Sequence, residues 1–233
     1  MIGAPRVHHR TTDSTNERAK ELARAGAPHG TLVTAGEQNA GRGRQGREWT
    51  APPGAAVLMS VVLRDLGEAQ ELLPLAAAVA ACQAAEAVAP VECRVKWPND
   101  VWVDGRKLAG ILIEGRPQEG WAVLGIGLNV TTPAFAPDLA DLATSLAIAA
   151  PAQAPAPGRV LDELVIRLEH RLADAPAAIL TAWRERDALR GSAVRWSDGE
   201  GTAAGIDDSG SLLVDTDSGT LALHAGEVHL LRG

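Results

Sequence analysis

The sequence predicts a mixed α/β (α+β) fold in which helices pack on one largely antiparallel sheet, followed by a small C-terminal β-barrel. Three observations lead to this prediction: segments with helical periodicity, short β-branched runs between turn residues, and a change to short strand-like runs alone after residue 190. The 233 residues, 46% of them hydrophobic, suffice for one catalytic-sized domain and a small second unit.

Four segments carry the signals of helices. In the first, Ser14 is followed three residues later by Glu17, the spacing of a capping box. In the second, apolar residues recur with the i, i+3, i+4 spacing of a helix with one buried face, and its alanines favour helix. In the last, Pro176 suits the first turn of a helix. The predicted helices are residues 14–25, 72–88, 160–172 and 176–189.

Short apolar runs separated by turn residues predict the strands. The Ala/Pro-rich segment 147–158 has no periodicity and is predicted to be a surface connection. The predicted strands of the larger part are residues 31–35, 56–63, 93–97, 101–103, 107–114 and 121–130. Those of the smaller part are residues 192–196, 201–206, 212–215, 220–224 and 228–231. We therefore expect two domains, 1–188 and 189–233, the second too small to be stable alone and packed on the first.

The charge and the lack of targeting signals restrict the function. The chain has 22 Lys and Arg against 29 Asp and Glu, a net charge of −7, which disfavours non-specific binding to a nucleic-acid backbone. Its longest uncharged stretches are too short or too proline-rich to cross a bilayer, which takes about 20 apolar residues. Its N-terminus lacks the apolar run of a secretory signal. A cytoplasmic protein without membrane contact is expected.

Neither cysteines nor histidines suggest a disulfide or a metal site. Cys82 and Cys93 show neither CxxC spacing nor a disulfide framework, so both are expected to be reduced and buried. The sequence contains no HExxH motif and no His/Cys cluster, so no metal held by protein ligands is expected.

Residues 41–47, GRGRQGR, place three arginines and three glycines together without an acid. Glycines let a loop move, and guanidinium groups can bond phosphate in a bidentate manner. Three interpretations stay open from these residues: a loop that closes over a phosphorylated ligand, a solvated basic loop, and a nucleic-acid-binding segment. The loop is not a P-loop, because the sequence contains no GxxxxGK(S/T).

Residues 96–100, KWPND, are predicted to lie where a strand ends, because Pro98 cannot donate to a strand ladder. Asn99 and Asp100 would then project from the end of the sheet, where active sites are common, although an ordinary turn has the same composition. Lys96 and Lys107 favour a functional role, since lysines neutralise charge on a transferred phosphoryl group.

The strand predicted over 121–130 has two different faces. One face is apolar, whereas the other carries Gly125, Gly127 and Asn129. Bare glycines in a strand indicate a close approach to its backbone, either by a flat ligand or by a neighbouring side chain or helix. Both interpretations stay open.

Together these motifs resemble those of the biotin protein ligases. The similarity extends over essentially the whole chain: STN at 14–16, the GRGRQGR loop ending at Trp49, KWPND, RKLAGILIE, GIGLN and the small C-terminal barrel. Each motif alone is weak, but five in this order are specific. The resemblance implies a class II synthetase-like catalytic domain with a mixed, largely antiparallel sheet and an SH3-like C-terminal domain.

The resemblance also implies a two-step reaction. Biotin and ATP, with Mg²⁺, give biotinyl-5′-adenylate and pyrophosphate, and the biotinyl group then passes to one lysine of a biotin carboxyl carrier protein or domain. Some members carry an N-terminal DNA-binding domain, but Ser14 lies so near the start that a monofunctional form without DNA binding is expected here. The sequence leaves open whether the ligase forms a homodimer.

Site residues follow from the resemblance position by position. The biotin-pocket positions are Ser14, Thr15, Asn16, Gln38, Gly41, Arg42, Lys107, Gly110 and Gly125; the ATP positions are Arg44, Arg47, Trp49, Lys96, Asn99, Lys107 and Asn129. Lys107, Arg44 and Asp100 are the expected catalytic residues. Lys107 is expected beside the biotin carboxylate and the α-phosphate, and Asp100 beside the incoming lysine. Gln45 stands where some members have arginine, so the loop carries one charge fewer.

Two other classes serve as alternatives. A lipoate ligase shares the fold class and the adenylate chemistry, but the pairing of GRGRQGR with KWPND is closer to the biotin branch. A non-catalytic nucleic-acid-binding protein could use the arginine loop, but the net charge of −7 disfavours it.

Overall fold

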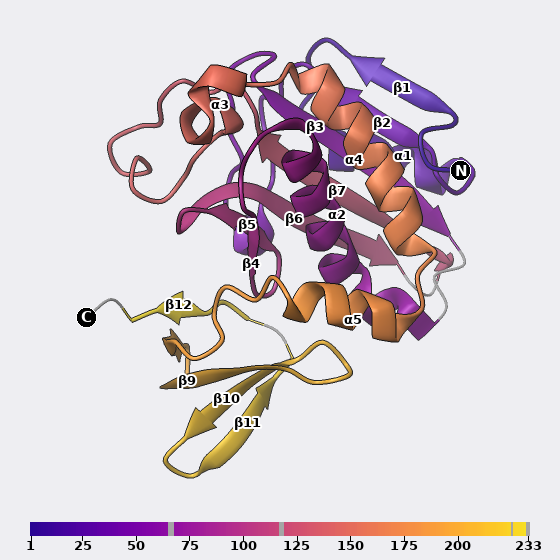
Figure 1. Cartoon of the computed structure of the whole chain (residues 1–233). Helices are drawn as coiled ribbons and strands as arrows, with labels where there is room; N and C mark the ends of the chain where they lie inside the picture. Colours follow the sequence, from indigo (N-terminus) through magenta and orange to yellow (C-terminus); the bar gives the residue numbers. More distant parts are fainter. Residues whose placement is uncertain (65–67, 117–118, 225, 232–233) are drawn as a thin grey trace.

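The computed structural model describes residues 1–64, 68–116, 119–224 and 226–231, and it contains two sheets (Figure 1). The larger sheet consists, in spatial order, of β1 (Arg6–His9), β2 (Leu32–Ala35), β3 (Ala56–Arg64), β7 (Trp121–Asn129), β6 (Arg106–Arg116), β5 (Asp100–Val103) and β4 (Arg94–Lys96). The smaller, antiparallel sheet consists of β11 (Gly219–Leu223), β10 (Leu212–Thr216), β9 (Gly199–Ile206), β8 (Ala193–Trp196) and β12 (His229–Leu230). The predicted α/β fold with a C-terminal β unit is confirmed.

Strand β1 was not predicted. It pairs in parallel with β2, whereas every other pairing in the larger sheet is antiparallel within the described residues. The sequence RVHH gives no apolar alternation, because β1 is an edge strand whose side chains are exposed or half-buried in turn. Its position in the sheet comes from its partner and not from its own composition.

Helices cover both faces of the larger sheet. They are α1 (Thr15–Arg24), α2 (Leu73–Val88), α3 (Leu146–Ala149), α4 (Pro157–Leu172) and α5 (Pro176–Arg184), with 3₁₀ turns η1 (Arg44–Gly46), η2 (Glu68–Leu72) and η4 (Pro151–Gln153). Helices α2 and α4 pack against each other on one face of the sheet and share the main core with Met59 and Val61 of β3, whereas α1 packs on Val62 and Val123 of the opposite face (Figure 1). The glycines of β7 lie on this second face, the one that α1 covers.

The helical segment Gln70–Val88 differs from the expectation that no stretch of the chain is long enough to cross a bilayer. By length and composition alone, this segment could cross a membrane. However, 67% of its apolar window is buried inside the protein, and most α2 side chains belong to the main core. Small alanine side chains let neighbouring helices approach closely, so the apolar character of this segment is that of a core helix.

Three predicted elements differ from the structure, one in its capping and two in their limits. Ser14 precedes α1, but its side chain makes no capping hydrogen bond, and Glu17 bonds Lys20 and not the cap. The segment 147–158 is not only a connection, because it contains most of α3 and all of η4. Helix α5 ends at Arg184, since the residues that follow pair with β4: Val95 N donates to Arg186 O at 2.7 Å.

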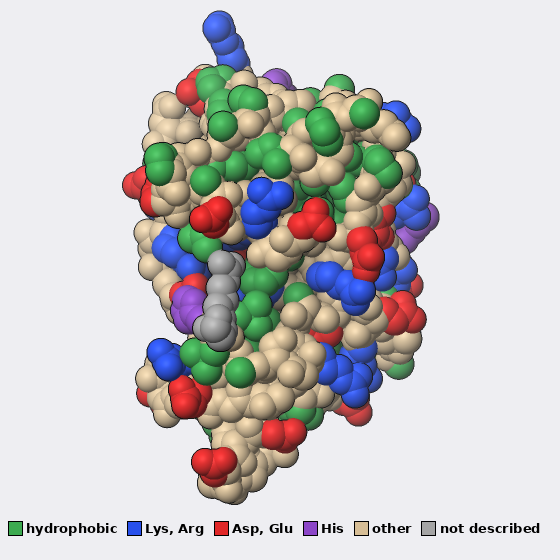
Figure 2. All heavy atoms as spheres, turned by 60° about the vertical axis from the view of Figure 1, so that its left-hand side comes forward, with side chains coloured by type: hydrophobic (Ala, Val, Ile, Leu, Met, Phe, Trp, Pro, Cys, Tyr) green, Lys and Arg blue, Asp and Glu red, His purple; other side chains and the backbone are tan. Residues whose placement is uncertain are grey.

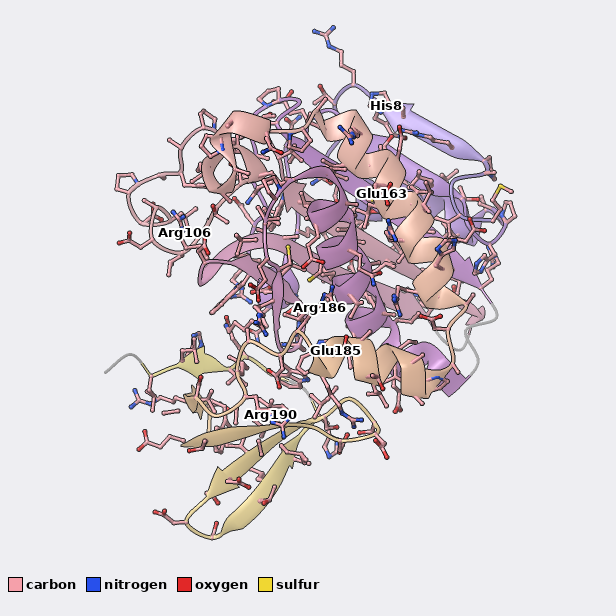
Figure 3. The ribbon with its side chains drawn as sticks, in the orientation of Figure 1. His8, Arg106, Glu163, Glu185, Arg186 and Arg190 are labelled. Carbon is pink, nitrogen blue, oxygen red and sulfur yellow. The ribbon has the colours of Figure 1, made fainter. Side chains whose placement is uncertain are left out.

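The smaller sheet packs on the larger part through one continuous core. Val194, Leu212 and Val214 belong to the same buried cluster as α2. Trp97 Nε1 donates to Gly210 O at 3.0 Å across the junction. Figure 3 shows Arg186 and Arg190 along the chain that connects α5 to β8. The expected packing is present, whereas the exact boundary at residue 189 stays a prediction.

Both cysteines are free and buried, as expected. Cys82 lies on α2 and is 0% exposed, and Cys93 precedes β4 and is 1% exposed. Burial raises the pKa of the Cys82 thiol well above its ordinary value, with a further contribution from a hydrogen bond to Cys93. The Cys82 thiol therefore stays protonated at neutral pH.

Candidate active site

A cavity of about 650 Å³ lies on the α1 side of the larger sheet. It is lined by the start of α1, the segment 38–52, the β4–β5 turn, β6, β7, the segment 132–143 and two residues of the C-terminal sheet. Figure 2 shows Lys and Arg side chains interspersed with acidic ones across the middle of the molecule, between the larger part and the C-terminal sheet. A second hollow of about 510 Å³ lies beside residues 40–48.

Every residue predicted for the site, with the exception of Gly41, lines the larger cavity. Gly41 lies in the neighbouring hollow, and a Cβ there would meet the backbone oxygen of Trp49 at 2.2 Å, so only glycine fits. Residues from the two ends of the chain thus meet at one place.

A buried polar cluster closes one end of the cavity. Gln38 Oε1 accepts hydrogen bonds from the backbone nitrogen of Thr15 at 2.7 Å and from its hydroxyl at 3.0 Å. Ser60 Oγ lies 2.8 Å from Thr15 Oγ1 and 2.6 Å from Asn16 Oδ1. Sequence reasoning missed Ser60, although a lone hydroxyl in the apolar run of β3 was a usable signal. Because the oxygen of Gln38 is occupied, its amide NH₂ is the group left to bind a ligand.

The glycines of β6 and β7 are covered by protein side chains. A Cβ at Gly125 would lie 2.1 Å from Asn16 Oδ1, and one at Gly127 would lie 2.5 Å from the Trp49 ring. Gly110 pairs with Gly127 across the sheet, and its Cβ would lie 3.2 Å from the same ring. For Gly125 and Gly127 the close neighbour is therefore a side chain, the second of the two interpretations that the sequence left open. The indole of Trp49 forms part of the wall.

Lys107 is held between an acid and an aromatic ring. Its Nζ lies 2.7 Å from Asp100 Oδ1 and 5.8 Å from the centre of the Trp49 ring. Its backbone donates to Leu142 O at 2.7 Å and accepts from Thr144 N at 2.8 Å. The ammonium is thus fixed at a point where it can neutralise a developing negative charge.

A second lysine contributes charge at the same end of the sheet. Lys96 Nζ lies 5.4 Å from the centre of the Trp102 ring. Burial lowers the pKa of Lys96 below its ordinary value, although the carboxylates of Asp100 and Glu227 act in the opposite direction. An anionic ligand would compensate for this burial.

Each arginine of the GRGRQGR loop has its own partner. Arg42 pairs with Glu17 at 2.6 Å, and Arg47 pairs with Glu227 of the C-terminal sheet. Arg44 donates to Asn99 Oδ1 at 3.1 Å and to Gly226 O at 3.2 Å. The loop is therefore docked between α1, the KWPND segment and the C-terminal sheet, which simple solvation of its arginines would not produce.

The fold and the site define a class. A mixed sheet joined to a C-terminal antiparallel sheet is an arrangement shared with a solved biotin protein ligase. Residues 8–130 match the Biotin/lipoate A/B protein ligase family, and residues 197–231 match the Biotin protein ligase C terminal domain.

Individual relatives narrow this class. The chain is 36% identical to the bifunctional ligase/repressor BirA of Bacillus subtilis, over 99% of this chain and 75% of that protein. It is 37% identical to the biotin–acetyl-CoA-carboxylase ligase of Mycobacterium tuberculosis, over 95% and 87%. The structure of the biotin protein ligase from Aquifex aeolicus in complex with biotin and ATP superposes with a TM-score of 0.86 at 26% identity, covering 99% of this chain and 100% of that one. The chain belongs to the biotin protein ligases.

Proposed function

We propose that this protein activates biotin with ATP and attaches it to a specific lysine of a biotin carboxyl carrier protein or domain, of acetyl-CoA carboxylase or a related carboxylase. The observation that carries the proposal is the meeting of the polar cluster, Lys107 and the arginine loop in one cavity. Support comes from relatives named biotin–acetyl-CoA-carboxylase ligases, which this chain matches over 95% and 93% of its length.

The first step joins two anions. A carboxylate oxygen of biotin attacks the α-phosphorus of ATP, the bond between this phosphorus and the α,β-bridging oxygen breaks, and the β- and γ-phosphates leave as pyrophosphate. Lys107 is proposed to contact both the carboxylate and the α-phosphate, and Arg44 to contact the phosphate; both side chains line the cavity. Two cations in a half-buried site would reduce the repulsion between the reacting groups.

The second step releases AMP. The uncharged amine of the carrier lysine attacks the acyl carbon, an amide bond forms, and the bond to the phosphate oxygen breaks. Asp100 lies at the edge of the cavity and is 18% exposed, a position from which it can accept the proton of the amine.

Substrate recognition follows the polarity of the cavity. The cluster of Ser14, Thr15, Asn16 and Gln38 suits the ureido ring of biotin, with Gly41, Arg42, Gly110 and Gly125 around it. Arg47, Trp49, Lys96, Asn99 and Asn129 suit the nucleotide. Within the described residues no cluster of three or more His, Cys, Asp or Glu could hold a metal ion. Mg²⁺ is therefore proposed to arrive as part of the ATP substrate, bound by its phosphates.

Biotinylation of a carrier domain tests the proposal. The protein is incubated with biotin, ATP and Mg²⁺ and a biotin carboxyl carrier domain, and the intact mass of the carrier is measured. One biotinyl group per carrier is expected, and none on a carrier whose acceptor lysine is replaced by arginine. An unmodified carrier under these conditions would contradict the proposal.

The GRGRQGR loop is predicted to become more ordered when the adenylate binds. Ordering costs about 1 to 2 kcal/mol per residue, and contacts between arginines and phosphate would offset that cost. Hydrogen exchange of residues 41–47 should therefore slow when biotin and ATP are added. Equal exchange in both conditions would show that the loop is not a lid ordered by its ligand.

Substitution of Arg44 with glycine is predicted to allow adenylate formation but to release the adenylate early. The variant would lose the contacts to Asn99 and Gly226 that hold the loop closed. Labelling of lysines on an unrelated bystander protein measures the leak, with Arg10→Gly as a control outside the cavity. A variant that labels bystanders no more than the wild type would contradict this role.

Alanine at Gly125 is predicted to weaken both folding and biotin binding. Its Cβ would lie 2.1 Å from Asn16 Oδ1, which Ser60 and Glu114 hold in place, so Asn16 must move. Overpacking of this kind costs about 1 to 3 kcal/mol of unfolding free energy. Denaturant unfolding and calorimetry with biotin measure the two effects. Alanine at Gly158 of α4, where a Cβ meets nothing within 4 Å, is the control: it should leave biotin binding unchanged and stabilise the fold by about 0.4 to 1 kcal/mol.

A further inference from the structure

A chain of charged side chains lies behind the proposed biotin pocket. Glu114 on β6 accepts hydrogen bonds from Asn16 Nδ2 and from Lys20 Nζ, each at 2.8 Å. Lys20 also pairs with Glu17 at 2.7 Å, and the same carboxylate oxygen of Glu17 contacts Arg42. The network therefore connects the wall of the pocket with the arginine loop.

The amide of Asn16 is bound at both ends. Its Nδ2 donates to Glu114, and its Oδ1 lies 2.6 Å from Ser60 Oγ, which donates to it. The residue is only 4% exposed, yet it lines the cavity, and Oδ1 lies directly above Gly125. The acceptor end of the amide thus faces the cavity side of β7, and the donor end faces Glu114.

Glu114 determines this orientation. An ionised carboxylate can only accept hydrogen bonds, so both of its partners must be donors, and the amide of Asn16 must direct its NH₂ toward it. Burial alone would raise the pKa of Glu114, but hydrogen bonds from Lys20 and Asn16 outweigh burial and keep this pKa below its ordinary value. The carboxylate is therefore ionised at neutral pH.

We propose that Glu114 is a positioning residue for biotin: it fixes the Asn16 amide so that Oδ1 accepts a hydrogen bond from a ring N–H of the ureido group. The inference rests on the proposed function. A cyclic urea carries two N–H donors. A flipped Asn16 amide would direct its own NH₂ donors toward them, and no hydrogen bond could form. Lys20 neutralises the half-buried Glu114 carboxylate, which lines the smaller hollow, and Lys20 itself lines neither hollow.

The isosteric substitution Glu114→Gln tests the orientation. A glutamine amide has one donor end, which must face either Lys20 or Asn16, so the Asn16 amide loses its fixed orientation. We expect the Kd of biotin, measured by calorimetry without ATP, to rise about tenfold, the effect of one hydrogen bond between neutral groups. The kcat of adenylation at saturating biotin and the KM of ATP should not change, since only ground-state binding of biotin is affected.

Two variants serve as controls. Glu119→Gln removes a carboxylate that pairs with Arg116 at 2.8 Å and lines neither hollow, so its biotin Kd should equal that of the wild type. Glu114→Asp retains an acceptor-only group and should recover part of the lost affinity. Cyclic carbamate analogues of biotin, in which oxygen replaces one ring N–H, give a third comparison. The isomer that lacks the N–H facing Asn16 should bind to the wild type and to Glu114→Gln with equal affinity.

The outcomes separate the two proposals. A folded Glu114→Gln variant with the biotin Kd of the wild type would overturn the positioning role, and so would an equal loss of biotin and ATP affinity, which a merely structural role produces. If both carbamate isomers lose as much affinity as biotin does on Glu114→Gln, the positioning role is also wrong. A wild-type protein that does not bind biotin would contradict the proposed function instead.

Discussion

Alanine at Lys107 is expected to slow adenylate formation about a hundredfold, because loss of one preorganised charge contact costs on the order of 3 kcal/mol. The ammonium of Lys107 is held by its 2.7 Å contact with Asp100. The backbone N–H and C=O of Lys107 each make one hydrogen bond, which fixes the residue in place. A cation fixed in advance needs no reorganisation when negative charge develops between carboxylate and α-phosphate. Pyrophosphate release in a single turnover with saturating biotin and ATP measures the rate.

Arg106→Ala is the matched control for this experiment. It removes a cation from the neighbouring position of β6, near the β5–β6 turn and outside the residues that line the cavity (Figure 3). Because Lys107→Ala also leaves Asp100 without its cation, the double variant with Asp100→Asn shows whether the unpaired carboxylate causes the loss. Near-normal adenylate formation by Lys107→Ala would contradict the assignment.

A chain that ends at Arg190 is expected to fold at least in part but to transfer biotin poorly to the carrier. The C-terminal sheet supplies Gly226 O, which accepts from Arg44, and Glu227, which pairs with Arg47. Without them, the loop loses two of its attachments, and Trp97 loses its hydrogen bond to Gly210. Circular dichroism reports the remaining fold, and a single-turnover assay from preformed biotinyl-adenylate reports transfer.

Point substitutions in the full chain refine this prediction. Glu227→Gln removes the carboxylate that pairs with Arg47 and lies 4.0 Å from His229 Nε2, and it should slow transfer less than the truncation does. Glu200→Gln breaks a pair with Arg195 inside the C-terminal sheet and should transfer at the wild-type rate. Transfer at the full rate by the truncated chain would show that the C-terminal sheet is not needed for catalysis or carrier docking.

Local patterns predicted the elements whose signals are local. The helix over 72–88 and the two faces of β7 follow from neighbouring residues, and the structure agrees with them, although α2 is buried on nearly all sides and not on one face. Strand β1 was missed because its place depends on β2, 26 residues further along the chain at the paired positions. The capping box was wrong because Glu17 has stronger partners in Lys20 and Arg42.

The site divides in the same way. Motifs and resemblance identified the arginine loop, KWPND and Lys107, all of which meet at the cavity. The contacts that hold these groups could not be predicted, since Asn16 and Glu114 are 98 residues apart and Arg44 and Gly226 are 182 apart. Ser60, Glu114 and Glu227 look like ordinary polar residues in the sequence, and only the fold shows what they contact.

The small-molecule product of the first step tests most directly whether this protein is a biotin ligase. The wild-type protein is incubated with ATP and Mg²⁺ and either biotin or lipoate, and the products are identified by mass spectrometry. Biotinyl-5′-adenylate with biotin, and no lipoyl-adenylate with lipoate, is the expected result. Lipoyl-adenylate with lipoate alone, or no adenylate with either acid, would contradict the assignment.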